Sequence, residues 1–133
     1  WKHFNKETLN YVGYGGHGNQ IRDVLHIIDL CKLILIQIRK INTINNKIFT
    51  VGGSSQSYTS LSELTNICQK ITNNTVKIGK KKITSIYDIP YYITDNKFVK
   101  KTYNWKPKKN IYDVVADTYI WILRNKKKLI KYF

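Results

Sequence analysis

The stretch from Ile28 to Arg39 places the strongest constraint on the fold, because it predicts a helix that is apolar nearly all the way round. Only Asp29, Lys32 and Gln37 interrupt its apolar positions. A helix of this kind is usually buried on more than one side, so other elements should pack around it. The apolar run at 27–38 is too short to cross a bilayer and carries two charges. We therefore predict a core helix, with no membrane span and no membrane partner.

Strand-like and helix-like segments alternate along the rest of the chain. Strands are expected at Leu9–Val12, Ile21–Ile27, Ile48–Val51, Val76–Ile78 and Tyr91–Ile93. Helices are expected at 28–39, after the capping box Ser60–Glu63, after a cap at Thr94 or Asp95, and from Asn110 to Lys126. This order predicts an α/β domain over residues 1–133. The strands are too few for a doubly wound sheet covered on both faces, so part of the fold should lie outside this chain.

The composition indicates a piece of an intracellular protein. The chain begins at Trp1 and contains no Met, and its apolar fraction of 42% is sufficient for a packed core. The first residues contain no apolar leader, which favours a cytoplasmic location. Cys31 and Cys68 fall in predicted helices, where we interpret them as small core residues and not as a disulfide.

The net charge of +15 would ordinarily suggest a polyanionic partner. Most of the basic residues are lysines, however, and the chain is also rich in Asn and Ile, a combination that AT-rich codons supply. Proteins that read base edges rely more heavily on arginine. Nucleic acid is therefore a disfavoured partner, although a non-catalytic basic module for nucleic acid or another polyanion remains the alternative function.

The segment Gly13–Gly18 reads GYGGHG and satisfies the G-x-G-x-x-G pattern of dinucleotide sites. That chemistry needs a helix N-terminus directly behind the glycines, whereas residues 19–26 are strand-like. We interpret the glycines as a connection between two strands and expect no cofactor site in this chain. The three histidines, His3, His17 and His26, lack metal-ligand spacing, so no metal is expected either.

Arg22 is the most informative polar residue, because it lies on a predicted strand just beyond the glycine turn. The arginine side chain presents a rigid fork of donors that can bind a phosphate bidentately, whereas lysine acts as a point charge. An ion pair with a neighbouring carboxylate is the competing interpretation, and the residues alone do not separate the two.

Residues 11–16 (YVGYGG) followed by 20–30 (QIRDVLHIIDL) resemble the same region of the extended short-chain dehydrogenase/reductases, the NAD-dependent epimerase/dehydratase family. Within that superfamily the resemblance is strongest to the CDP-paratose 2-epimerases. Residues 49–53 (FTVGG) before 60–64 (SLSEL) are similar to a late core strand and its following helix. Residues 88–95 (DIPYYITD) with 104–107 (NWKP) are similar to the C-terminal signature.

The resemblance covers the C-terminal, substrate-binding portion of that family, so it implies that the Rossmann half is absent. In the family that half holds NAD and a Tyr-x-x-x-Lys pair, and no tyrosine here is followed by lysine four positions later. We therefore expect no catalytic residue and no cofactor in this chain, and NAD in the parent enzyme. The implied ligand is a nucleotide sugar, with a CDP-sugar favoured, and the implied partner is the missing half.

The resemblance implies that Arg22 binds the diphosphate and that Asn10, Tyr11 and Val12 form the strand edge that meets the nucleotide. The full set of expected substrate-binding residues is Asn10, Tyr11, Val12, Gln20, Arg22, Thr50, Ser85 and Asp88. Two of these depart from the family pattern. Thr50 stands where the family usually has Asn, and Ser85 stands where it usually has a second phosphate-contacting Arg. We expect a nucleotide-sugar-binding part of an epimerase that is inactive alone.

Overall fold

The computed structural model describes residues 1–44 and 46–132. By their internal contacts these residues form two compact units. Unit 1 comprises Trp1–Gln20, Ser60–Pro90 and Tyr112–Phe133, and unit 2 comprises Ile21–Thr59 and Tyr91–Ile111. Each unit is built from segments that are distant in the sequence, so neither corresponds to a continuous half of the chain.

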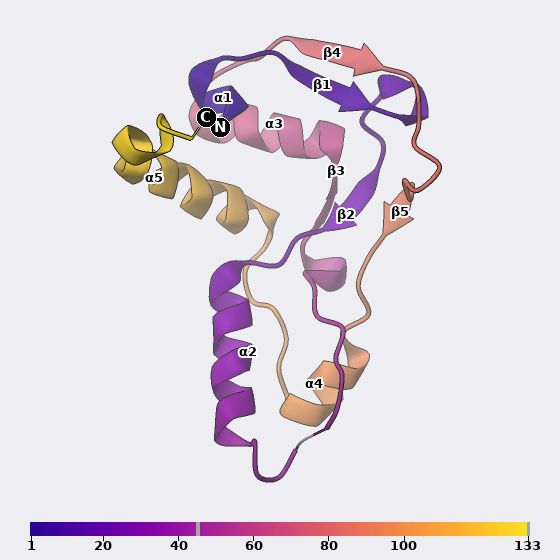
Figure 1. Cartoon of the computed structure of the whole chain (residues 1–133), viewed down its shortest axis with the longest axis vertical. Coiled ribbons are helices and arrows are strands. Elements are labelled where there is room, and N and C mark those ends of the chain that lie inside the picture. The colour runs from indigo at the N-terminus through magenta and orange to yellow at the C-terminus, as the bar shows by residue number, and fades with distance from the viewer. Residues whose placement is uncertain (45, 133) are drawn as a thin grey trace. The chain divides into compact units, whose positions relative to one another are not determined.

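Unit 1 combines a pair of parallel strands with helices. Strand β1 (Leu9–Val12) pairs in parallel with β4 (Ile78–Lys81), in a register that places Leu9 opposite Ile78. The helix α3 (Leu61–Thr72) lies along this ribbon, and the short α1 (Lys2–Asn5) contacts α3 (Figure 1). The helix α5 (Ile111–Leu129) completes the unit. Parallel strands need a long crossover between them, and here the crossover runs through unit 2 and α3.

The predicted capping box at the start of α3 is confirmed. The N–H of Glu63 donates to Ser60 Oγ at 3.2 Å, and the N–H of Ser60 donates to Glu63 Oε2 at 2.8 Å. The two residues thus satisfy backbone donors that a helix N-terminus would otherwise leave open. Ile67, at the centre of the apolar stripe of α3, is buried.

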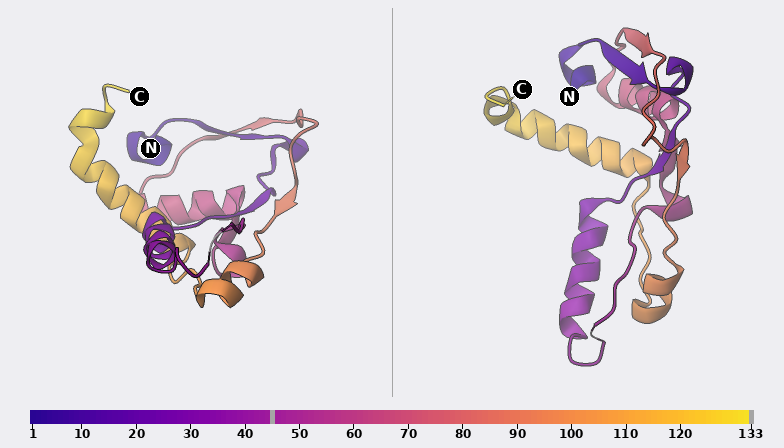
Figure 2. Two further views of the ribbon diagram at one scale, coloured as in Figure 1. Left: turned by 60° about the horizontal axis from the view of Figure 1, so that its bottom comes forward. Right: turned by 45° about the vertical axis from the view of Figure 1, so that its right-hand side comes forward.

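Unit 2 contains a small sheet and two helices. The strands are ordered β3 (Tyr58–Ser60), β2 (Ile21–Asp23) and β5 (Tyr91–Tyr92), with β2 and β5 parallel. The helices α2 (Ile27–Arg39) and α4 (Lys97–Tyr103) contact one another and lie side by side in both views of Figure 2. A core of Leu33, Val99, Tyr103 and Trp105 fills the space between them.

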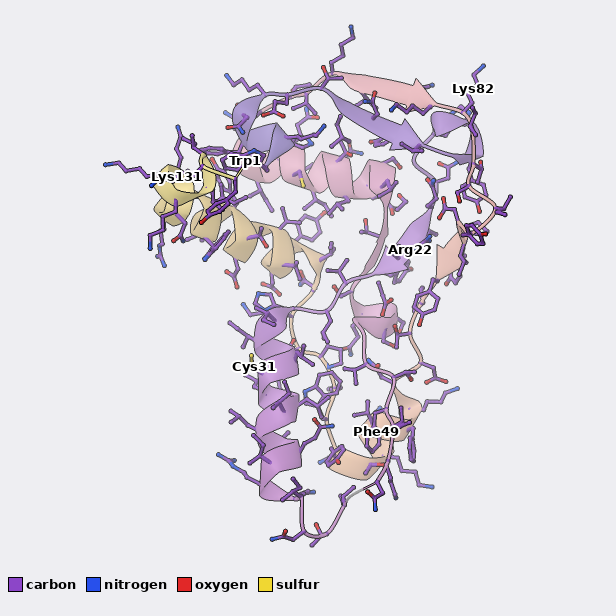
Figure 3. All side chains as sticks on the ribbon, viewed as in Figure 1. Trp1, Arg22, Cys31, Phe49, Lys82 and Lys131 are labelled. Carbon is purple, nitrogen blue, oxygen red and sulfur yellow. The ribbon has the colours of Figure 1, made fainter. Side chains whose placement is uncertain are left out.

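The sequence overestimated how deeply α2 is buried. Only Asp29 and Leu33 of this helix are buried, while Ile27 is 64% exposed and Ile38 is 59% exposed. Cys31 is exposed too, so its predicted core position is wrong, and Figure 3 shows its side chain on the outer side of α2. Apolar positions around a helix can be buried only where another element covers them, and this chain covers one side.

Several strand boundaries also differ from the prediction. Residues 48–51 form no strand in the described part of the chain, because no neighbouring segment supplies a ladder for them. The predicted strand 21–27 ends at Asp23, since His26 begins α2 as its N-cap and its Nδ1 accepts the N–H of Ile28. The strand β3 was missed, because its sequence Tyr-Thr-Ser is short and polar.

The strand expected at Val76–Ile78 lies at Ile78–Lys81 instead, as β4. The last two helices follow the sequence more closely. The final helix starts one residue after the expected Asn110 and continues to Leu129. The short helix α4 begins at Lys97, whose N–H donates to Asp95 Oδ1 at 2.8 Å. Among the described residues, no helix combines the length and the apolar character that crossing a membrane requires.

Candidate functional site

The glycine-rich turn after β1 follows a backbone path that few residues other than glycine adopt. The φ angle is 79° at Gly13, 74° at Gly15 and 72° at Gly18, and it is positive even at Tyr14, at 46°. The turn contains a short 3-10 helix, Tyr14–Gly16, and leads into strand β2, as the sequence predicted. The glycines therefore serve the turn itself.

Two side chains that the sequence analysis missed fix this turn to the loop before β5. The N–H of Tyr14 donates to Thr84 Oγ1 at 2.7 Å, and the Tyr14 hydroxyl donates to the carbonyl of Asp88 at 2.7 Å. The N–H of Gly13 also donates to the Lys81 carbonyl at 2.8 Å. No spacing pattern marks Tyr14 or Thr84, because their partners lie about seventy residues away along the chain.

Gln20 connects the end of β1 to the same loop. Its Nε2 donates to the Val12 carbonyl at 2.6 Å and to Asp88 Oδ2 at 3.4 Å, and the residue is 5% exposed. The Gln20 Oε1 atom is buried and has no hydrogen-bond partner among the residues that the structure describes. Three predicted site residues, Val12, Gln20 and Asp88, thus form one cluster in unit 1.

The other β1 residues of the predicted site lie beside this cluster. The ring of Tyr11 is buried, and it lies so close to Gly18 that a Cβ atom there would collide with it. Asn10 is exposed and its side chain rests against Gly79 on β4, where a Cβ would also collide. Gly18 therefore permits a close approach of the turn to the ring of Tyr11 on β1.

Ser85 takes a structural position in the loop of unit 1. Its carbonyl accepts the N–H of Asp88 at 3.0 Å, and its Oγ accepts the N–H of Tyr87 at 3.3 Å. The side chain is exposed. Ser85 therefore shapes the turn that presents Asp88, and its short hydroxyl has little of the reach that an arginine would have at this position.

Arg22 and Thr50 belong to unit 2. Arg22 is half-buried on β2, opposite Tyr92 of β5, and its Nη1 donates to the Ile21 carbonyl at 2.7 Å (Figure 3). The guanidinium group offers five N–H donors in all. Thr50 is exposed, and its hydroxyl donates to the carbonyl of Asp95 at 3.2 Å.

A polar network holds the segment after Thr50 against β2. Asp23 Oδ2 accepts the N–H of Ser54 at 2.7 Å, and Asp23 Oδ1 accepts the Thr94 hydroxyl at 3.2 Å. The amide of Asn96 then exchanges two hydrogen bonds with the backbone of Gly52, at 2.8 and 3.1 Å. The Asp23, Thr94 and Asn96 side chains are buried or half-buried, and they bond to one another or to the backbone, which holds the strand of Arg22 against the neighbouring segments.

Asp29 joins the start of α2 to the segment that follows α4. The N–H groups of Lys108 and Lys109 both donate to Asp29 Oδ2 at 2.8 Å, and the indole of Trp105 donates to the Asp29 carbonyl at 3.2 Å. The helix that follows the Arg22 strand is thus tied to the Asn104–Pro107 signature. From the sequence, Asp29 was identified only as a polar interruption of an apolar helix.

The groups whose pKa values are shifted lie outside the cluster of Val12, Gln20 and Asp88. Hydrogen bonds from the backbone and then the hydroxyl of Ser60 lower the pKa of Glu63, and a backbone hydrogen bond from Lys97 lowers the pKa of Asp95. Burial raises the pKa of the Cys68 thiol. Within the described residues, no group of three or more His, Cys, Asp or Glu side chains could hold a metal ion.

Comparison with solved structures defines the class of fold. The chain superposes with a TM-score of 0.83 on an epimerase from Methanothermobacter thermautotrophicus, at 14% identity, covering 98% of this chain and 37% of that one. A UDP-glucuronic acid 4-epimerase from Bacillus cereus, solved with UDP-glucuronic acid and NAD, gives 0.79 at 16% identity, covering 92% and 37%. A Thermotoga maritima UDP-glucose 4-epimerase, solved with UDP-glucose, gives 0.76 at 19% identity, covering 94% and 38%.

The chain therefore has the fold of the C-terminal portion of short-chain dehydrogenase/reductase-type epimerases, as predicted. In sequence it is similar to CDP-paratose 2-epimerase from Salmonella typhi, at 28% identity over 113 residues. The match covers 80% of this chain and 31% of that enzyme. The predicted resemblance is thus confirmed, and the chain spans about a third of the length of the proteins it matches. No family model matches the chain.

Proposed function

We propose that this chain is the nucleotide-sugar-binding part of an NAD-dependent nucleotide-sugar epimerase, with a CDP-sugar as its ligand. The observation that carries the proposal is the sequence match to CDP-paratose 2-epimerase over 80% of the chain. The fold supports it, because the structural neighbours include epimerases solved with UDP-sugars. The CDP preference rests on the sequence relative alone.

Arg22 is the residue that would bind the diphosphate of this ligand. It lies on β2, two residues beyond the cluster residue Gln20, and the Asp23 network holds its strand in place. A planar guanidinium can donate two parallel hydrogen bonds to a phosphate. The net charge of +15 adds a field that attracts a polyphosphate. Asn10, Tyr11, Val12, Gln20, Thr50, Ser85 and Asp88 remain proposed contacts or neighbours of the nucleotide.

The residues of this chain do not fit NAD. The only G-x-G-x-x-G run leads into a strand, so no helix N-terminus faces a pyrophosphate behind those glycines. We therefore assign NAD and the hydride chemistry to the missing half of the parent enzyme. The isolated chain should bind no NAD and catalyse no epimerisation.

The exposed apolar side of unit 2 is the surface on which we place that missing half. Ile27, Ile34, Ile38 and Ile41 recur at helical spacing on one side of α2 and its C-terminal turn, and each is at least 43% exposed. The segment 48–51 also belongs to no sheet within the described part of the chain, and Ile48 is 94% exposed. Apolar surface of this kind marks a partner contact, or promotes self-association when the partner is absent.

The test is a complementation experiment. The chain alone and the chain mixed with a Rossmann half from a CDP-paratose 2-epimerase are each titrated with CDP-glucose, UDP-glucose and duplex DNA at physiological salt. The proposal predicts saturable CDP-glucose binding and NAD retention in the complemented sample only. Tighter binding of DNA than of either nucleotide sugar would instead favour the basic-module alternative. NAD bound by the chain alone would contradict the assignment of the cofactor.

A further inference from the structure

Unit 2 contains a cavity that none of the proposed nucleotide contacts lines. It lies between the face of α2 that bears Leu35 and Ile36 and the segment 104–108, which follows α4, and it has a volume of about 540 Å³. Small-molecule sites in proteins usually occupy 300 to 1,000 Å³, roughly, so the size fits a metabolite. Trp105 forms part of the wall and is 5% exposed, and its indole N–H donates to the Asp29 carbonyl at 3.2 Å.

The cavity carries a strong excess of positive charge. Four of its lining residues are cations, contributed by two separate segments: Lys32, Arg39, Lys106 and Lys108. Asp29 is the one lining residue that carries a negative charge, and its Oδ2 atom already accepts two backbone N–H groups. Cations that converge on a concave apolar surface attract anions more strongly than the same charges on a flat, solvated face.

The carboxylate of Asp29 gives a second, independent indication that the cavity binds a ligand. The residue is 1% exposed, and its Oδ1 atom has no hydrogen-bond partner among the described residues. The ammonium group of Lys32 lies 3.9 Å away, which is too far for a hydrogen bond. A buried carboxylate oxygen without a donor is costly, so a ligand that brings a hydroxyl group to this atom would be favoured.

From these observations we propose that the cavity binds a small phosphorylated compound that also carries hydroxyl groups. The phosphate contacts the arginine and lysines, with Arg39 as the bidentate donor. A hydroxyl group donates to Asp29 Oδ1, and the apolar part of the ligand lies against Trp105. The site is separate from the proposed sugar-nucleotide contacts, so either assignment can fail without the other.

A ligand in the cavity and a partner on the apolar side of α2 can be bound at the same time. At about 100° per residue, Lys32 and Arg39 project roughly 100° or more away from Ile27, Ile34 and Ile38. A partner that covers the apolar side would therefore leave the cavity open. The phosphorylated ligand would then act on the assembled protein as a second, regulatory binding event or as a positional anchor.

Ribose 5-phosphate is the probe, and nuclear magnetic resonance of the ¹⁵N-labelled chain is the assay. Three signals report on the cavity itself: the indole N–H of Trp105 and the backbone N–H groups of Lys108 and Lys109. All three should shift together and saturably. Arg39→Gln should weaken binding by about 10-fold or more, as the loss of a charged hydrogen bond implies. The matched control Arg124→Gln, on the exposed surface of α5 in unit 1, should leave the affinity unchanged.

Two further titrations make the result decisive. Inorganic phosphate should bind about 10-fold more weakly than ribose 5-phosphate, because it cannot satisfy Asp29 and contact Trp105 at once. Ribose should not bind measurably, since it lacks the phosphate. Equal effects of Arg39→Gln and Arg124→Gln would show only general attraction by the net charge and would overturn the proposal. The absence of any shift at the three signals, in a chain whose spectrum is dispersed, would also overturn it.

Discussion

Asp29 connects helix α2 to the segment 104–109 through hydrogen bonds. Its Oδ2 atom accepts the N–H groups of Lys108 and Lys109, each at 2.8 Å, and its side chain is 1% exposed. Hydrogen bonds to a charged group contribute about 1.5–3 kcal/mol each. Water can reach the freed amides because Lys108 is exposed, so we take the low end for both bonds. Asp29→Ala should therefore cost about 3 kcal/mol of unfolding free energy, a large share of a typical total.

Urea unfolding and amide hydrogen exchange test this prediction together. Asp29→Asn keeps an oxygen acceptor but loses the charge, so it should cost about half as much. The exchange of the Lys108 and Lys109 amides should accelerate in both variants, while amides of α3 stay protected. Asp95→Asn, the same change at an exposed carboxylate, is the control and should alter the unfolding midpoint little. If Asp29→Asn and Asp95→Asn destabilise equally, the account of Asp29 as the link between α2 and the 104–109 segment is wrong.

The other predictions concern the α3 cap, the surface of α2 and the altered site loop. Ser60→Ala should cost about 1 kcal/mol of stability, measured by urea unfolding. Hydrogen bonds lower the pKa of Glu63 in the folded state, so its contribution is complete above its ordinary value of 4.5 and is lost as the pH falls through the lowered one. Glu63→Gln should remove that part of the acid destabilisation, which pH-dependent melts would detect. Ile34→Ser should reduce self-association of the chain in sedimentation experiments, because Ile34 is 43% exposed on the apolar side of α2. An unchanged sedimentation profile would count against that surface as a contact. Ser85→Arg should strengthen nucleotide-sugar binding in calorimetry if the missing arginine weakens the site.

Local chemistry made part of the fold predictable. The capping box at Ser60 and Glu63 was readable because both partners lie within one helical turn. Strand β1 was predicted with its exact ends, since Leu9–Val12 is a β-type run that ends at a glycine turn. Contacts between segments that lie far apart in the sequence could not be predicted in this way. The hydrogen bonds that Asp29 accepts from Lys108 and Lys109 connect residues about eighty positions apart, and no pattern in either segment predicts this contact.

Two of the wrong predictions share one physical cause. The helix α2 was expected to be covered on more than one side and residues 48–51 were expected to pair in a sheet, and the described residues of this chain supply neither contact. Both segments expose apolar side chains here, which agrees with a chain that spans about a third of the proteins it matches. For the site, the resemblance supplied the candidate residues, and the structure placed Val12, Gln20 and Asp88 together in unit 1.

The central claim, that Arg22 binds the diphosphate of a nucleotide sugar, is tested most directly by calorimetry on wild type and Arg22→Ala. The measurement uses the chain complemented with its other half, with CDP-glucose as the ligand. Loss of a charged hydrogen bond should weaken binding by about 1.5–3 kcal/mol, or roughly 10- to 150-fold. Arg22→Lys should recover only part of this, because an ammonium group lacks the planar fork. A structural ion pair would instead lower the melting temperature of Arg22→Ala and leave the affinity intact. Equal affinity for the two folded proteins would contradict the assignment.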